Sequence, residues 1–561
     1  MNDYFDLGDH TRPITTTSTL AQTWFDRGLT WCYGFNHEEA IRCFQKVLEQ
    51  DPDCAMGYWG LAYAASSFYN KPWDWFDRDE RIQVLASCYQ HTQKALTLSA
   101  RATAAEQQLI VALGQKHQSA ETEDVALLER WEQDYSISMR SVLKSNPDNL
   151  DIICLTAESM MNLARWKLWD ITNGIPARGA LTEESITMLE HGIALTEENK
   201  LSPHPGILHF YIHALEMSPQ PEKAQTAANQ LRDLCPESGH LLHMSTHIDI
   251  LCGDYLAVVE ANNQANKTDL KYIELRGRRE FYMISCMHNF HSKMYGAMFL
   301  GQFNAAMEAV NGIRSIITDD LLSTGTRYLR STLEAYYSSK VHVLVRFGLW
   351  QEIIDEPLPD NQSLYPVTTA LLYYGKGIAH AALGDISSAR DCKSVFDQLH
   401  ESIPDWHIVA NNPTIAVLDV AAAMLNGELE YHAANHELGY THLREACRLS
   451  DNLGYSEPWP WMHPPRHALG ALLLEQGQVE EAMLHYRDDL GLGNTLPRSH
   501  QHRNNIWALH GYLECLKKLD IKDQIDRFQQ KLDQTMLLAD FTIESSCCCR
   551  KETFSNASLP T

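Results

Sequence analysis

Apolar residues recur mostly at the three- and four-residue spacing of one helical face, and strand-like alternation of apolar and polar residues is rare. Short Gly-Asp and Asp-Pro pairs separate these periodic stretches, as turn residues do between helices. The segment from Trp24 to Pro52, WFDRGLTWCYGFNHEEAIRCFQKVLEQDP, shows both features. The pattern predicts an all-α protein made of short helices joined by tight turns.

The first helical stretch also has an internal frame. When Ala21 is counted as position 1, Gly28 falls at position 8, Trp31 at 11, Ala40 at 20 and Phe44 at 24. These are the small and large packing positions of the tetratricopeptide repeat (TPR), which has a period of 34 residues. The stretch therefore resembles a TPR, and the resemblance implies a TPR-like right-handed α-solenoid, a superhelix of helix–turn–helix repeats.

The same frame can be carried along most of the chain. It predicts a helical repeat domain over residues 21–540, with an N-terminal segment (1–20) before it and a cysteine-containing tail (541–561) after it. Insertions blur the frame between residues 70 and 150 and after Gly427. The predicted units lie near residues 21–54, 55–88, 150–183, 205–238, 239–272, 287–320, 334–367, 370–403, 463–496 and 504–537.

Histidines are concentrated at positions 2, 5 and 9 of the predicted units. These positions form one stripe on the first helix of a unit, roughly 130° around the helix from the packing positions. The TPR resemblance implies that this stripe lines the concave groove, where TPR proteins take ligands. Three consecutive units offer nine such slots, and chance predicts fewer than one histidine among them in a chain with 26 His in 561 residues. Seven are present, namely His209, His213, His240, His243, His247, His288 and His291.

So many imidazoles on neighbouring helices favour a metal site. They cannot all be protonated, because like charges a few ångströms apart repel strongly. Neutral imidazoles need partners for both ring nitrogens, and a bound ion satisfies several at once. A ligand set of imidazoles with few carboxylates suits Cu, Zn or Fe and disfavours Mg and Ca. Seven ligands exceed one closed zinc site, so the pattern leaves open two ions, or one ion with supporting histidines. A metal-free polar groove is the alternative.

Several other residues fall on or near the same stripe. Glu216 continues it at position 12, where a carboxylate could orient a ligand histidine or move a proton, so Glu216 is the candidate catalytic residue. The two slots without histidine hold Gly206 and Tyr295. The further candidates for groove-lining or supporting residues are Glu158, His342, Tyr295, Asp249 and Trp59.

Two functions remain open at this stage. The first is a metal-dependent enzyme, similar to an oxidase or oxygenase, that acts on a small organic or peptide substrate in the groove. The second is a non-catalytic TPR adaptor that binds a segment of a protein partner, which is the commonest use of the fold. Adaptor grooves for acidic tails usually present Lys and Arg. This frame presents His in those slots, which favours the enzyme.

Composition narrows the class of partner. The formal net charge of −26 disfavours nucleic acids and anionic membranes, because an acidic chain repels phosphate. No run of about 18 apolar residues predicts a membrane span, and the polar N-terminus lacks the apolar region of a signal peptide. Fourteen cysteines without a CxxC pattern suit a reducing compartment, so we expect a cytoplasmic protein.

Two local features stand outside the repeat pattern. The segment YSEPWPWMHPPRH, from Tyr455 to His467, is dense in aromatic residues and prolines, and it predicts a packed loop between repeats or a lid over the groove. Three adjacent thiols, Cys547 to Cys549, lie near the polar C-terminal end. They could bind metal or carry a lipid, but the composition favours an inert run.

Several stretches together resemble a His-rich group of TPR proteins from bacteria and fungi. They are FNHEEAIRCFQKVLEQDPDCAMGYWG, HFYIHALE, GHLLHMSTHI, HNFH, DWHIVANN and EPWPW. The chain is more distantly similar to tetratricopeptide repeat protein 38 of animals. The resemblance covers the chain from about Trp24 to the cysteine run, and it implies the helical-repeat fold but no established activity. Ser245 and Asp249 depart from the proline and aromatic residue that the bacterial pattern leads us to expect.

Overall fold

The computed structural model describes residues 4–493 and 495–550, and it is built almost entirely from α-helices, as predicted. The chain divides into two compact units, one formed by residues 1–248 and 264–286 and the other by residues 249–263 and 287–561. Among the described residues, no helix is both long enough and apolar enough to cross a membrane.

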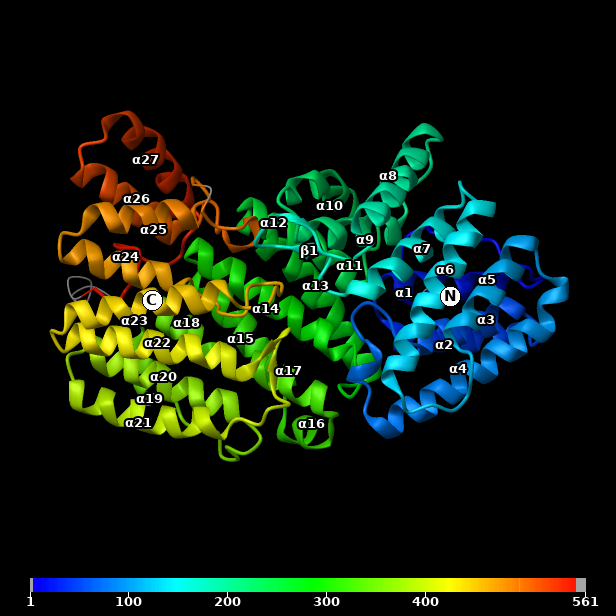
Figure 1. Cartoon of the computed structure of the whole chain (residues 1–561), viewed down its shortest axis with the longest axis horizontal. Helices are drawn as coiled ribbons and strands as arrows, with labels where there is room; N and C mark the ends of the chain where they lie inside the picture. Colours follow the sequence, from blue (N-terminus) through cyan, green and yellow to red (C-terminus); the bar gives the residue numbers. More distant parts are fainter. Residues whose placement is uncertain (1–3, 494, 551–561) are drawn as a thin grey trace. The chain divides into compact units, whose positions relative to one another are not determined.

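Eleven α-helices lie wholly in the first unit (Figure 1). They are α1 (Thr19–Tyr33), α2 (His37–Gln50), α3 (Ala55–Ala65), α4 (Arg78–Leu98), α5 (Ala104–Lys116), α6 (Val125–Ser145), α7 (Leu150–Met161), α8 (Thr182–Glu198), α9 (Pro205–Glu216), α10 (Gln225–Leu231) and α11 (Gly239–His243). Three more contribute residues to both units, namely α12 (Ser245–Cys252), α13 (Tyr255–Arg276) and α14 (Met283–Leu300).

The second unit continues with helices of similar length. They are α15 (Phe303–Ile316), α16 (Asp319–Thr324), α17 (Arg327–Tyr337), α18 (Lys340–Arg346), α19 (Trp350–Asp355), α20 (Pro366–Ala382), α21 (Ile386–Ser402), α22 (Thr414–His432), α23 (His436–Asp451), α24 (Pro465–Glu475), α25 (Val479–Asp489), α26 (Ile506–Lys518) and α27 (Lys522–Met536). Short 3₁₀ helices are η1 (Trp73–Trp75), η2 (Ser99–Arg101), η3 (Asn162–Ala164), η4 (Pro221–Ala224) and η5 (Arg498–His500). Two antiparallel pairs of short strands join β1 (Trp169–Asp170) to β2 (Ile175–Pro176) and β3 (Ile408–Val409) to β4 (Asn412–Pro413).

Helices pack in the alternating manner of stacked helical hairpins. Consecutive helices such as α1 and α2, or α22 and α23, pack against each other, and so do the first helices of successive pairs, such as α1 and α3 or α20 and α22. Capping side chains define the ends, since Ser18 accepts a hydrogen bond from the backbone of Ala21 in α1 and Asn36 accepts one from Glu39 in α2. The fold is therefore TPR-like within each unit.

The structure differs from the predicted frame where extra residues enter a pair. The second helix expected near residues 150–183 is α8, which begins only at Thr182, because residues 162–181 form η3 and the β1–β2 turn. Likewise α4 begins at Arg78, after a loop that contains η1. The first blurred region holds the pair of α5 with α6, and after Gly427 the chain completes α22 and forms α23, which packs against it. Residues 551–561 of the predicted tail lie outside the described residues.

Phe44 lies in the core of the first repeat, and its ring leaves no space for a side chain at two glycine positions. A Cβ added to Gly28 in α1 would lie 2.8 Å from the Phe44 ring, and one added to Gly60 in α3 would lie 2.4 Å from it. The Phe44 ring is fully buried and lies against both helices. Close approach of α1 and α3 to Phe44 therefore requires glycine at both positions.

We expect Gly28→Ala to lower the free energy of unfolding by about 1–2 kcal/mol, because overpacking outweighs the gain in helix propensity. Gly114 in α5 is the matched control, since a Cβ there would meet no atom closer than 4.0 Å. Gly114→Ala should instead stabilise by up to about 1 kcal/mol. Urea unfolding of the two variants checks both signs, and equal effects would contradict the packing argument.

Candidate metal centre

Five of the seven predicted histidines come together in the first unit, and two helical segments supply them. Helix α9 carries His209 and His213 one turn apart, and its last residue is Glu216. Proline at the first turn and the His204 side chain at the N-cap fix where α9 begins. The segment of α11 and α12 carries His240, His243 and His247 at the predicted three- and four-residue spacings.

The five imidazoles form a closed ring of neighbouring side chains. Going around the ring, centroids of adjacent imidazoles lie 4.8–5.9 Å apart, in the order His209, His213, His247, His243 and His240. All five are at most 3% exposed, and Glu216 is 1% exposed. The prediction that these residues line an open groove is therefore wrong, because they lie in the interior of the unit.

Aromatic side chains from two loops cover part of this ring. Phe35, between α1 and α2, has its ring centroid 4.4 Å from that of His209 and 5.2 Å from that of His240. Its backbone has a φ of 56°, an unfavourable conformation for a bulky residue, which its buried packing stabilises. Tyr69, from the loop between α3 and α4, lies 5.1 Å from His213.

Hydrogen bonds at Nδ1 orient three of the imidazoles. Nδ1 of His209 lies 2.5 Å from the backbone oxygen of Tyr33, and Nδ1 of His213 lies 2.9 Å from Oε1 of Glu216. Nδ1 of His247 makes a short contact with the other Glu216 oxygen. Carbonyl and carboxylate oxygens accept, so each Nδ1 donates a proton and each Nε2 keeps a lone pair. Protein carbonyls and carboxylates hold metal-binding histidines in this same way.

The possible ligand atoms of one trio converge. His209, His213 and His240 each offer a ligand atom, and the three atoms lie within 4.8 Å of one another. Nε2 of His209 and Nε2 of His240 are 3.2 Å apart, which is also within hydrogen-bond distance when one of them carries a proton. Two nitrogens bound at about 2.0–2.1 Å to one tetrahedral ion lie about 3.3–3.4 Å apart, so this separation fits a single zinc-like ion. Burial, followed by the charge of His213, lowers the pKa of His209 well below its usual value, which keeps the lone pair available at neutral pH.

The other pair has the geometry of a hydrogen bond. Nε2 of His243 and Nε2 of His247 are 2.8 Å apart, closer than two ligands of a tetrahedral ion. Because His247 donates through Nδ1, its Nε2 accepts and His243 donates. Nδ1 of His243 is then the acceptor for the Thr246 hydroxyl at 3.3 Å. His243 and His247 therefore support the trio, with Glu216 linking His213 to His247.

One segment of the chain that contacts this site matches a known protein family. Residues 21–54 match the family model of the tetratricopeptide repeat. The chain therefore contains a tetratricopeptide repeat at residues 21–54. The match covers α1 and α2 and so includes the Phe35 turn against the imidazoles. Among curated proteins, none matches the sequence significantly.

Three of the solved structures that match this chain do so at low sequence identity and with TM-scores below 0.5. Yeast Tom70 is 12% identical, with 92% of this chain and 99% of that chain covered and a TM-score of 0.30. Human IFIT1, solved as a dimer with m7Gppp-AAAA, is 10% identical, with 93% and 91% covered and a TM-score of 0.32. Cut9, in the Cut9–Hcn1 hetero-tetramer of APC/C, is 11% identical, with 92% and 86% covered and a TM-score of 0.31.

The remaining predicted residues of the TPR stripe belong to the second unit. His288, His291 and Tyr295 lie on α14 beyond residue 286, and Asp249 is a buried residue of α12. His291 and His342 line a cavity of about 40 Å³, together with Tyr336, Ser339 and Glu457. Burial lowers the pKa of each of these two histidines to about 3. Tyr295 packs instead on Phe299, with ring centroids 4.6 Å apart.

Two predicted residues of the first unit lie away from the trio. Trp59 is a core residue and not a groove-lining one, and its ring is stacked on that of Tyr63 with centroids 5.0 Å apart. Glu158 is buried on α7 and accepts hydrogen bonds from Tyr63 and Asn162. Neither joins the histidines that offer convergent ligand atoms.

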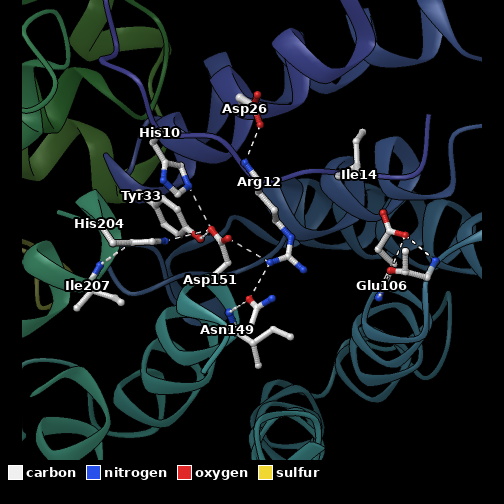
Figure 2. A network of polar contacts seen from close by, with 12 residues as sticks. His10, Arg12, Ile14, Asp26, Tyr33, Glu106, Asn149, Asp151, His204 and Ile207 are labelled. Atoms are coloured by element: carbon white, nitrogen blue, oxygen red, sulfur yellow. Dashed lines mark hydrogen bonds and ion pairs between the residues drawn. The ribbon is translucent and has the colours of Figure 1, made fainter. Parts of the chain in front are cut away.

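A second histidine cluster, which no sequence pattern indicated, joins the N-terminal segment to Asp151 of α7. Figure 2 shows His10, Arg12 and His204 converging on Asp151. Nδ1 of His204 accepts the backbone N–H of Ile207 at 3.2 Å, so its Nε2 carries the proton and donates to Asp151 at 3.1 Å. A proton on that nitrogen, and the Arg12 charge 3.2 Å from Asp151, disfavour a metal there. The cluster instead holds residues 10–12 on the first unit.

Proposed function

We propose that this TPR protein is a non-catalytic interaction scaffold whose first unit is stabilised by one transition-metal ion bound to His209, His213 and His240. One observation carries the proposal. Backbone and carboxylate acceptors hold Nδ1 of His209 and His213, and His209, His213 and His240 each offer a ligand atom within 4.8 Å of the other two in a buried site. Such an arrangement is preorganised for an ion with a preference for nitrogen ligands, such as zinc or copper.

Burial of the site favours a structural ion over a catalytic one. A substrate of an oxidase or oxygenase must reach an open coordination position, whereas the imidazoles here are at most 3% exposed. Glu216 accepts from two histidines, which suits an orienting role better than proton transfer to a substrate. TPR repeats commonly bind protein segments, and this analogy supports a protein partner. The net charge of −26 makes a basic partner more favourable than a nucleic acid.

Metal analysis of protein purified without a histidine tag tests the proposal. We expect about one equivalent of zinc, and X-ray absorption should show a shell of nitrogen at about 2.0–2.1 Å. His240→Ala should remove the metal, whereas His243→Asn, which changes the hydrogen-bonded pair, should retain most of it. Circular dichroism and thermal unfolding of each variant separate loss of ligand from loss of fold.

The result of the metal analysis distinguishes a structural metal site from a catalytic one and from no metal site. Less than about 0.2 equivalents of any transition metal, with no binding on titration, would refute the metal site. A sulfur shell at about 2.3 Å would place the ion at cysteines instead. One equivalent of copper or iron together with oxygen consumption would support the enzyme over the scaffold. Zinc whose removal lowers the thermal midpoint supports the structural role.

A further inference from the structure

The three adjacent cysteines near the C-terminal end have different surroundings. Residues 541–550 pack within the second unit, where Phe541 lies 5.0 Å from Phe347 and Asp540 accepts a hydrogen bond from the first residue of α15. Cys549 is buried, while Cys547 and Cys548 are half-buried. The three thiols are therefore not equivalent, and their chemical properties are expected to differ.

Cys547 and Cys549 face each other across a tight turn. Sγ of Cys547 accepts the backbone N–H of Cys549 at 3.4 Å, and the Ser545 hydroxyl donates to the backbone oxygen of Cys547 at 2.6 Å. The backbone N–H directed at the Cys547 sulfur favours the thiolate form of that sulfur.

A buried cation lies next to this turn. Nη2 of Arg346, in α18, donates to the backbone oxygen of Ser546 at 2.6 Å, and Nη1 donates to Nδ1 of His467 at 3.0 Å. The guanidinium packs on the Trp507 ring at 3.8 Å and is only 5% exposed. Within the described part of the chain, no carboxylate lies within ion-pair distance of Arg346. A buried cation is stabilised by a nearby anion, and the Cys547 thiolate is placed to provide it.

The charged and titratable groups that face Cys547 come from several elements. They are Arg346 of α18, Glu428 of α22, Tyr374 of α20, Tyr486 of α25, and Cys549 and Arg550 of its own segment. The hydrogen bond from Cys549 outweighs burial and, with Arg346, lowers the pKa of Cys547 to about 7. Burial instead raises the pKa of Cys548 to about 12 and that of Cys549 well above its usual value.

The Cys548 side chain packs against Gly348. Its Cβ lies 2.5 Å, and its Sγ 3.1 Å, from the point where a side chain on Gly348 would begin. Gly348 stands in the turn before α19 with a φ of 67°, and the absence of a side chain there makes room for Cys548. Cys548 is therefore a packing residue and the natural control for its two neighbours.

We propose that Cys547 and Cys549 form a peroxide-reactive dithiol that closes to a disulfide. The Cys547 thiolate attacks one oxygen of a hydroperoxide, the O–O bond breaks, and a sulfenic acid forms while water or an alcohol leaves after taking up a proton. The Cys549 thiol then attacks the sulfenic sulfur, and the S–S bond forms with loss of a second water. The two thiols lose two electrons, and the peroxide gains them.

Mass spectrometry of the full-length protein tests this assignment. At neutral pH, limiting iodoacetamide should label Cys547 more than about tenfold faster than Cys548, and the labelling rate should rise to half its maximum near pH 7. Hydrogen peroxide should lower the mass of the 547–549 peptide by about 2 Da, as expected for one disulfide. Cys548→Ser should leave both results unchanged. In Cys549→Ser, the sulfenic acid should persist and be trapped by dimedone.

Each opposite result overturns the proposal. Labelling of Cys548 at a rate similar to that of Cys547 would show that the turn does not activate one thiol. Loss of the mass change in Cys548→Ser would show that Cys548 takes part in the disulfide. If wild-type thiols stay unreacted with excess peroxide while the protein remains folded by circular dichroism, the pair is structural only.

Discussion

Lowering the pH from about 7 to 5 is expected to unfold the metal-free protein. Burial lowers the pKa of many histidines, which therefore stay neutral in the folded state. The values fall to about 3 for His37, His291 and His342, and to about 4 for His407, His467 and His500. They fall well below the usual range for His117, His209 and His463.

The difference in histidine pKa between the folded and unfolded states determines whether acid stabilises or destabilises the fold. These histidines have a pKa near 6.5 in the unfolded chain, so below that pH the unfolded state binds protons that the folded state does not. Stability is therefore greatest above about pH 6.5 and falls as the pH decreases toward the folded values. Buried carboxyl groups with raised pKa values act the opposite way, because the folded state takes up their protons first. They are Asp26, Glu158, Glu334 and Glu428.

The histidines outnumber the opposing carboxyl groups. A net uptake of about five protons on unfolding corresponds to about 7 kcal/mol per pH unit at full effect. That is comparable to the whole free energy of unfolding of a typical protein, about 5–15 kcal/mol. We therefore expect the midpoint of acid unfolding between about pH 5 and 6, well above the range in which exposed carboxylates titrate.

Thermal unfolding followed by circular dichroism between pH 8 and 5 measures this dependence. His342→Phe removes one buried titrating group and should reduce the proton uptake by about one, whereas the exposed His191→Phe should leave it unchanged. A thermal midpoint that stays constant from pH 7.5 to 5.5 would contradict the expected proton uptake. Because burial keeps the ligand His209 neutral in the fold, bound metal should be released with acid unfolding and not before it.

The sequence was sufficient to predict the helices and the convergence of five histidines. Spacings of three and four residues place His209 with His213, and His240 with His243 and His247, on single helical faces whatever the tertiary packing. The period of the repeat then places α9 and the α11–α12 segment in neighbouring pairs. Glu216 followed from the same stripe, and the structure shows it bonded to His213 and His247.

The burial of the site could not be predicted from the repeat pattern. Tyr69 covers His213 from a loop that interrupts the pair of α3 and α4, and a periodic frame has no position for such a loop. Phe35 occupies a turn position with positive φ, where the general expectation is glycine. The tautomers depend on the backbone oxygen of Tyr33, 176 positions from His209 in sequence. Contacts of this kind come only from the folded chain.

Asp489 is a buried carboxylate in the second unit, and its removal is expected to lower the free energy of unfolding strongly. Asp489, the last residue of α25, accepts from Nε2 of His467 and Nδ1 of His502, both at 2.8 Å, and from the Asn505 amide at 2.9 Å. Its side chain is fully buried. Burial would raise its pKa, but the contacts with His467 and His502 outweigh burial and lower it below its usual value. Asp489 is therefore an anion on which three side chains depend.

Asp489 also determines which nitrogen of His467 carries the proton, because His467 connects Asp489 to Arg346 through hydrogen bonds. Nη1 of Arg346 donates to Nδ1 of His467, so His467 must carry its proton on Nε2, and that N–H donates to Asp489. Burial lowers the pKa of His467 to about 4, so this histidine is a neutral bridge between a cation and an anion. Removing Asp489 leaves two imidazole donors and one amide donor without an acceptor.

We expect Asp489→Ala to lower the free energy of unfolding by about 3–5 kcal/mol, the usual cost of breaking a buried charged network from one side. The neighbouring Asp488→Ala is the control, since Asp488 only accepts an exposed hydrogen bond from Thr495 and should cost less than about 1 kcal/mol. Urea unfolding with unchanged slope gives both values. If Asp489→Ala stays within about 1 kcal/mol of the wild type, the buried donors have found other acceptors, and the network does not organise this part of the second unit.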